Sequence, residues 1–148
     1  MSNNNTMTHI TLWVMRCIAV CLVILIPFMP SLLDWYGTTR VLSHAKYMAI
    51  LLAFYCSTVV TLPALWQLDK LLRNILAGQV FVRRNLTCIR WVQWCCLGVS
   101  LICLPAACVY LPLFFVVILM GFLTLMITVV VRVMAAAVEI REENDLTI

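Results

Sequence analysis

The 148-residue chain is 65% hydrophobic and only 11% charged, with a mean hydropathy of +1.07. It has too few polar side chains to cover a soluble globule, so the composition excludes a soluble domain and is typical of helices that face lipid. The formal charge of +4 is a weak argument for nucleic-acid binding, because the basic residues lie beside apolar runs, as in cytoplasmic loops of membrane proteins.

Four apolar segments are long enough to cross a bilayer, whose hydrocarbon core needs about 20 helical residues. They cover about residues 11–33, 47–68, 91–110 and 113–131. The polar first ten residues contain no lysine or arginine, so the pattern of a cleavable signal peptide is missing and we expect the first span to be retained. The expected fold class is all-α: an integral membrane four-helix bundle that forms one domain over residues 1–148.

The first span and the connection after it contain several local signals. Arg16 is close enough to the start of the span to extend its charged group outward into water. Pro27 and Pro30 predict a kink near the far end. The segment Asp34–Lys46 reads as a short loop, with aromatic residues at the membrane interface.

The second span is expected to continue beyond the membrane as an amphipathic helix. After Leu65, leucine and isoleucine recur at steps of three and four residues, while Lys70 and Arg73 lie on the other face. Gly78 follows where a helix C-cap is expected. The loop over residues 69–90 should therefore begin as a structured elbow between the second and third spans.

Small residues repeat at every fourth position of the second span, a spacing that lets another helix approach closely. They are Ala49, Ala53, Ser57 and Thr61. The fourth span carries similar residues at Gly121, Thr124 and Thr128. We expect both faces to pack against other helices.

The basic residues predict the orientation of the chain in the membrane. The loop over residues 69–90 carries five of them, whereas the first connection carries only Arg40 and Lys46 and the last turn carries none. Positive charge favours the cytoplasmic side, so this loop and, with four spans, both termini are expected there. The tail over residues 132–148 should extend the last helix into the cytoplasm.

The sequence contains no recognisable catalytic, cofactor or metal site. The four predicted spans contain no aspartate, glutamate, histidine or lysine, although proton-coupled transport usually relies on a membrane-embedded acid. The eight cysteines include no CxxC pair, and the adjacent Cys95 and Cys96 point about 100° apart on a helix. Packing is the favoured interpretation of these cysteines. We expect no enzyme, no cofactor and no metal, and composition and motifs alone indicate no biochemical activity.

A basic loop and an acidic tail are the remaining candidate surface. They offer a docking site for a soluble partner, but two simpler interpretations stay open. In the first, the charges of loop and tail neutralise each other. In the second, the basic residues only set topology and contact anionic lipid, at about 1 kcal/mol each. Direct nucleic-acid binding is not expected, because a short loop offers few phosphate contacts. The candidate interaction surface comprises Lys70, Arg73, Gly78, Phe81, Arg83, Arg84, Asn85, Arg90, Glu142, Glu143, Asn144 and Asp145.

Two stretches of the chain resemble a known family. The run LDKLLRNILAGQVFVRRNLTCIRW places Gly78, Phe81 and Asn85 as Gly-x-x-Phe-x-x-x-Asn, followed by the basic Arg90, and the chain ends in EENDLTI. Together they resemble a family of small four-helix bacterial membrane proteins classed only as a domain of unknown function. Such proteins are often encoded beside a small helix-turn-helix regulator of the Cro/C1 type. The resemblance implies, by association, a protein of the bacterial cytoplasmic membrane that holds or releases a regulator.

Three hypotheses for function follow. The first is a non-enzymatic interaction module whose partners are the lipid bilayer and a soluble helix-turn-helix regulator. The second is a small transporter or channel, formed as a homo-oligomer because four short spans enclose little by themselves. The third is a cytoplasm-facing thiol redox sensor that uses Cys88, Cys95 or Cys96.

Overall fold

The chain folds into four α-helices, as predicted. The computed structural model describes residues 2–39, 43–78 and 82–146, and these ranges contain no β-strand. Each helix is long and apolar enough to cross a membrane. The helices are α1 (Ser2–Thr39), α2 (His44–Leu76), α3 (Arg83–Val109) and α4 (Pro112–Leu146).

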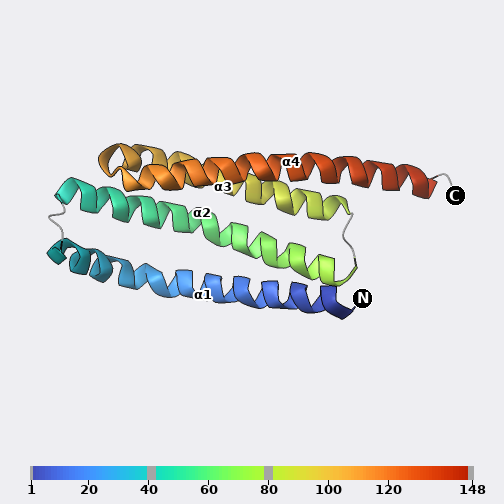
Figure 1. Cartoon of the computed structure of the whole chain (residues 1–148), viewed down its shortest axis with the longest axis horizontal. Coiled ribbons are helices and arrows are strands. Elements are labelled where there is room, and N and C mark those ends of the chain that lie inside the picture. Colours follow the sequence, from blue (N-terminus) through green and yellow to red (C-terminus); the bar gives the residue numbers. More distant parts are fainter. Residues whose placement is uncertain (1, 40–42, 79–81, 147–148) are drawn as a thin grey trace.

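The helices run up and down, each antiparallel to the one before it (Figure 1). In the described ranges, α1 approaches within 8 Å between Cα atoms only α2, α2 also approaches α3, and α3 approaches α4. The bundle is therefore a sequential row in which α1 has one close neighbour. The start of α1, the end of α2, the start of α3 and the end of α4 lie at the same end of the bundle, and the last turns of α4 project beyond the other helices (Figure 1).

The outer surface of the bundle is apolar over most of its length. Val59 of α2 is 71% exposed, and Phe115 and Leu125 of α4 are 72% and 67% exposed. A soluble protein rarely exposes apolar side chains on this scale. Lipid solvates such a surface, and each helix satisfies its own backbone hydrogen bonds. The chain is a multi-pass membrane protein.

Tryptophan and tyrosine residues, which favour the two faces of a bilayer, occur near both ends of α1 and α2. In α2, about 19 residues separate Tyr47 from Trp66, and a similar interval separates Arg16 from Trp35 in α1. Either interval rises about 28 Å, close to the thickness of a hydrocarbon core. On α3, Trp91 is 57% exposed, toward the end of the bundle at which α3 begins. These positions place the ends of the helices outside the hydrocarbon.

The helix interfaces combine small side chains with isolated hydrogen bonds. The small-residue stripe of α2 faces α3, with Ala53 buried and the Ser57 hydroxyl 3.6 Å from the Cys103 thiol. Between α3 and α4, the Gln93 side-chain amide donates a 2.8 Å hydrogen bond to the Thr128 hydroxyl. Small residues bring the backbones close, and these polar contacts fix how the helices align along their axes.

A hydrogen bond from α2 compensates for a proline in α1. Pro30 has no N–H, so the carbonyl of Ile26, four residues earlier, loses its intrahelical donor. The Tyr55 hydroxyl donates to this carbonyl oxygen at 3.1 Å. A carbonyl without a partner is costly in hydrocarbon, and a neighbouring side chain is one way to satisfy it. Tyr55 thereby links α2 to the middle of α1.

The helices extend further than the sequence patterns indicate. The loop predicted over Asp34–Lys46 is wrong for most of its length, because α1 continues to Thr39 and α2 begins at His44. The Thr38 hydroxyl donates a hydrogen bond to the Trp35 carbonyl in the last turn of α1. Apolar patterning marks only the part of a helix that lipid covers. The intrahelical backbone hydrogen bonds form in water as well, so the helix can extend beyond the apolar segment.

Candidate functional site

One end of the bundle, called here the basic end, collects most of the positive charge. It is the end at which α1 and α3 begin and α2 and α4 end (Figure 1). Among the described residues, eight basic side chains belong to the helix halves nearest this end: Arg16, Lys70, Arg73, Arg83, Arg84, Arg90, Arg132 and Arg141.

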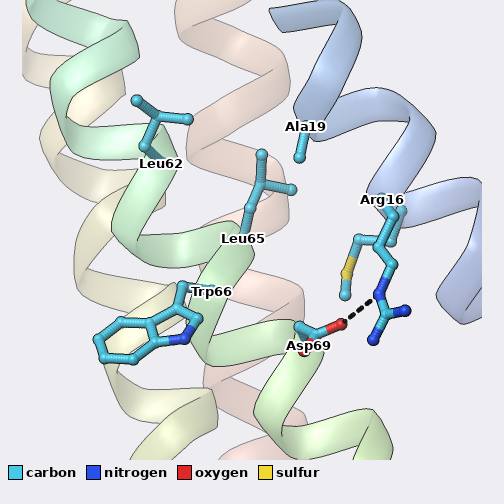
Figure 2. A pocket seen from close by; sticks show the side chains of 7 residues that line it. Arg16, Ala19, Leu62, Leu65, Trp66 and Asp69 are labelled. Atoms are coloured by element: carbon cyan, nitrogen blue, oxygen red, sulfur yellow. Dashed lines mark hydrogen bonds and ion pairs between the residues drawn. The ribbon is translucent and has the colours of Figure 1, made fainter. Parts of the chain in front are cut away.

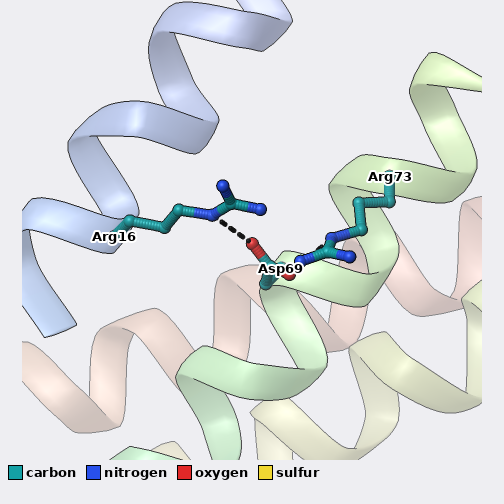
Figure 3. A network of polar contacts seen from close by, with 3 residues as sticks. All are labelled: Arg16, Asp69 and Arg73. Carbon is teal, nitrogen blue, oxygen red and sulfur yellow. Dashed lines mark hydrogen bonds and ion pairs between the residues drawn. The ribbon is translucent and has the colours of Figure 1, made fainter.

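Asp69 of α2 holds two arginines at the basic end (Figure 3). Its Oδ1 accepts from Nε of Arg16 on α1 at 3.1 Å, and its Oδ2 lies 2.7 Å from Nε of Arg73, one turn further along α2. The Asp69 side chain is only 17% exposed, whereas Arg16 and Arg73 are 50% and 63% exposed. Arg16 thus extends toward a carboxylate on the neighbouring helix, where the sequence predicted only an approach to water.

The α2–α3 connection begins with the predicted glycine cap. Gly78 has a φ of +76°, a left-handed conformation that other residues rarely adopt, and its N–H donates to the Ile75 carbonyl at 3.0 Å. Beyond the connection, Asn85 of α3 is 1% exposed and accepts a 2.8 Å hydrogen bond from the Asn74 side-chain amide of α2. Gly78 therefore ends α2 in a left-handed turn, and Asn85 links the start of α3 to the last turns of α2. The buried side chain of Asn85 offers no surface to a partner.

Arg83 of α3 and Glu142 of α4 form a two-point ion pair across the basic end. Nε and an Nη of Arg83 lie 2.8 and 2.6 Å from the two carboxylate oxygens of Glu142. The hydrogen bond from Arg83 lowers the pKa of Glu142, which lies well outside the hydrocarbon. For this pair, the interpretation that loop and tail neutralise each other agrees with the contact.

The other predicted surface residues are distributed over the basic end without converging on one point. Arg84 and Arg90 are exposed on α3, Lys70 is half-buried on α2, and Glu143 and Asn144 are exposed on the last turns of α4. Phe81 lies outside the described residues, as does the side chain of Asp145. Arg90 borders a groove of about 370 Å³ between α3 and α4, which also includes Arg83 and Glu139.

A cavity of about 350 Å³ lies between all four helices in the apolar part of the bundle. Its lining is apolar, with Phe54 among the aliphatic side chains, except for Ser57, Thr58, Thr61 and Cys103. Thr58 and Thr61 donate to carbonyl oxygens of their own helix at 2.8 and 2.7 Å. No charged side chain lines this cavity, so it offers an ion little beyond hydroxyl dipoles.

A second cleft, of about 260 Å³, separates α1 from α2 beside the Arg16–Asp69 pair (Figure 2). Leu62 and Leu65 of α2 and Ala19 of α1 lie along it. Arg16 and Asp69 line the part of it nearest the basic end, and the rest of its lining is apolar.

The cysteines differ in burial, and those described form neither a disulfide nor a metal cluster. Cys88 and Cys103 are buried, Cys95 and Cys96 are partly buried, and the described ranges contain no disulfide. Those ranges also contain no cluster of histidine, cysteine and carboxylate side chains that could hold a metal ion. The three cysteines named for redox sensing are all on α3.

Sequence reasoning missed Asp69. It is the one acidic residue in the run from Leu68 to Arg90, and it directly follows the predicted second span. A lone carboxylate among basic residues, at a membrane boundary where α1 carries Arg16, is the signal that could have identified the pair. The α1–α2 pairing needed to connect the two residues comes only from the fold.

A family model described as "Protein of unknown function (DUF2975)" matches residues 8–148, nearly the whole chain. The chain belongs to the DUF2975 family. Membership agrees with the resemblance to a family classed as a domain of unknown function, while the loop and tail motifs and the neighbouring regulator stay predictions. A search of curated proteins and a search of solved structures each found no match for this DUF2975 protein.

Proposed function

We propose that this DUF2975 protein is a non-enzymatic docking protein of the bacterial cytoplasmic membrane. In this proposal the basic end faces the cytoplasm, in keeping with the positive-inside rule, and binds a soluble partner. The observation that carries the proposal is the projecting end of α4 (Figure 1). From Arg132 to Leu146 the helix rises about 21 Å, which takes its last turns well away from the hydrocarbon.

Toward its C-terminal end α4 carries apolar side chains that the other helices leave exposed. Val133 and Ile140, seven residues apart on one side of α4, are 64% and 67% exposed, and Leu146 is 87% exposed at the tip. Val138, on another side, is 5% exposed. An amphipathic helix end with an uncovered apolar stripe is suited to a groove on another protein. The Arg83–Glu142 ion pair supports this geometry by tying α4 to α3.

The proposed partner is the soluble helix-turn-helix regulator that the family resemblance implies. Arg141, next to Ile140 in α4, is exposed, as is Arg84 in the first turn of α3, so an acidic rim around an apolar groove on the regulator would complement this surface. Holding a regulator at the membrane would keep it from its DNA. This step needs binding energy only and no chemical reaction, in keeping with a non-enzymatic protein.

The test is co-purification of the detergent-solubilised full chain with the regulator encoded beside it. We expect the full chain to retain the regulator, and we expect Ile140→Asp, or removal of residues Glu139–Ile148, to lower retention at least tenfold. Ala45→Asp, at an exposed position at the opposite end, is the matched control. Failure of the full chain to retain the regulator, or equal retention by Ile140→Asp, would contradict the proposal.

A transporter is the second candidate, favoured by the cavity between the four helices. Its apolar lining suits a small uncharged molecule, and a homo-oligomer would be required to enclose a continuous path. Reconstitution in liposomes tests this candidate. Flux of an apolar dye that is slowed by Ser57→Leu, which fills the cavity, would support transport, and protein-containing liposomes as tight as empty ones would exclude it for that dye.

A further inference from the structure

The cleft between α1 and α2 joins a charged mouth to an apolar interior. Ala19 and Leu62 lie farther from the basic end than Arg16 and Asp69, so the cleft runs from the charged pair toward the middle of the bilayer (Figure 2). Its volume is about 260 Å³. Ala19 is the small residue that leaves this space open between the two helices.

Positive charge is in surplus at the charged end of the cleft, counting Arg73 one turn beyond its lining. Arg16 and Arg73 share the single carboxylate of Asp69, so the three groups together carry one net positive charge (Figure 3). Both arginines contact Asp69 through Nε, and their terminal Nη groups have no further polar partner in the part of the chain that the structure describes. A guanidinium carries five N–H donors, so several donors remain for an anion.

The mouth also lies at the level where lipid headgroups are found. Trp66 borders the cleft and is 72% exposed, and tryptophan favours the boundary between hydrocarbon and water. Toward the bilayer centre the lining becomes entirely aliphatic, with Leu62, Leu65 and Ala19. An occupant that matches both parts must carry a negative group at one end and a flexible apolar chain at the other.

We propose that this cleft is a binding site for one anionic phospholipid. The phosphate lies against the outward Nη groups of Arg16 and Arg73, and one acyl chain occupies the apolar cleft below. A free phosphate would leave the apolar space unfilled, and a lipid without net charge would leave the surplus charge of the two arginines unmatched. Anionic lipid is present in the membrane around the helices, and basic pockets between membrane helices bind such headgroups.

Lipid retention is the direct test. The full chain is purified in detergent from an equimolar mixture of phosphatidylglycerol and phosphatidylcholine with identical acyl chains, and the lipid that stays bound is measured by native mass spectrometry. Arg73→Gln removes one phosphate contact but keeps the Arg16–Asp69 bond, and Ala19→Phe fills the cleft without changing the charge. Arg84→Gln, an exposed arginine at the same end, is the control.

We expect the wild type and Arg84→Gln to retain one phosphatidylglycerol in preference to phosphatidylcholine. Arg73→Gln should retain it about fivefold less, the equivalent of about 1 kcal/mol, and Ala19→Phe should lose it. Circular dichroism confirms that each variant is folded. Equal retention of the two lipids by the wild type, retention by Ala19→Phe, or displacement by millimolar glycerophosphoglycerol, which has the headgroup without the chains, would overturn the proposal.

Discussion

Replacing Tyr55 by phenylalanine should destabilise the docking of α1 on α2. The substitution removes only the hydroxyl that donates to the Ile26 carbonyl at 3.1 Å. Pro30 has already removed the intrahelical donor of that carbonyl, so the variant leaves the oxygen without a partner in the apolar part of the bundle. The ring of residue 55 stays in place, so the change in packing is small.

Two energy ranges bound the loss of stability expected from Tyr55→Phe. An unsatisfied backbone group in hydrocarbon costs several kcal/mol, but hydrogen bonds between membrane helices contribute on average about 0.6 and at most about 1.7 kcal/mol. The smaller range applies, because an undocked α1 in lipid still contains Pro30 and the same orphaned carbonyl. We expect Tyr55→Phe to lower the free energy of unfolding by about 1 kcal/mol.

A double-mutant cycle identifies the cause. Pro30→Ala restores an N–H for the Ile26 carbonyl, so Tyr55→Phe should cost little in that background, with a coupling energy of about 1 kcal/mol. Pro27→Ala frees a donor for a different carbonyl and is the control. Unfolding is followed by circular dichroism during titration with sodium dodecyl sulfate in mixed micelles. A cost below about 0.3 kcal/mol, or equal rescue by Pro27→Ala, would refute this reasoning.

Three further predictions concern other contacts. Glu142 has a lowered pKa, so its ion pair with Arg83 is fully formed above the ordinary glutamate range, about pH 4, and is lost as pH falls through the lowered value. Amide exchange of the last α4 turn, corrected for its intrinsic pH dependence, should therefore accelerate on acidification, and Arg83→Gln should abolish that step. Gly78→Ala should destabilise the chain by about 1 kcal/mol in the same dodecyl sulfate titration, and Gly78→Asn by less. The cost comes from the left-handed backbone, because no described atom beyond the chain neighbours lies within 4 Å of an added Cβ. Gln93→Leu should cost about 0.6 to 1.7 kcal/mol in that titration by removing the hydrogen bond to Thr128, and Thr128→Val in that background should cost little more.

The number and type of elements follow from the sequence because lipid imposes one simple rule. A span must be apolar and helical, so hydropathy alone predicts four helices, and the glycine rule predicts the left-handed cap at Gly78. Helix ends are different. Beyond the hydrocarbon, a helix such as Asp34–Thr39 of α1 is stabilised by its own backbone and by local contacts, and these leave no hydropathy signal.

The candidate site is only partly predictable for a related reason. Membership in a basic loop is visible in the sequence, but the partner of each charge depends on which helices lie side by side. Asn85 is a surface candidate by motif and is a buried contact of Asn74 in the fold. Asp69 is the reverse, unremarkable in the sequence and central to the link with α1. Polar residues that join helices cannot be separated from polar residues that meet water until the pairing is known.

Because α1 docks on the bundle through few contacts, a bound lipid can change how stably it docks. In the described ranges α1 approaches only α2 closely. Its polar links include Arg16–Asp69 near the basic end, Tyr55–Ile26 in the apolar part, and the Tyr36 and Tyr110 hydroxyls, 3.5 Å apart, toward the opposite end. A lipid that occupies the α1–α2 cleft contacts both helices, so it binds the docked state and not the undocked one. Such a ligand stabilises docking by about 2.7 kcal/mol at one hundred times its dissociation constant, which exceeds the contribution expected of any one of these polar links. At that concentration, an anionic phospholipid in this cleft would therefore stabilise the docking of α1 more than any one of these polar links. The docking of α1 would then depend on membrane composition more than on any one side chain.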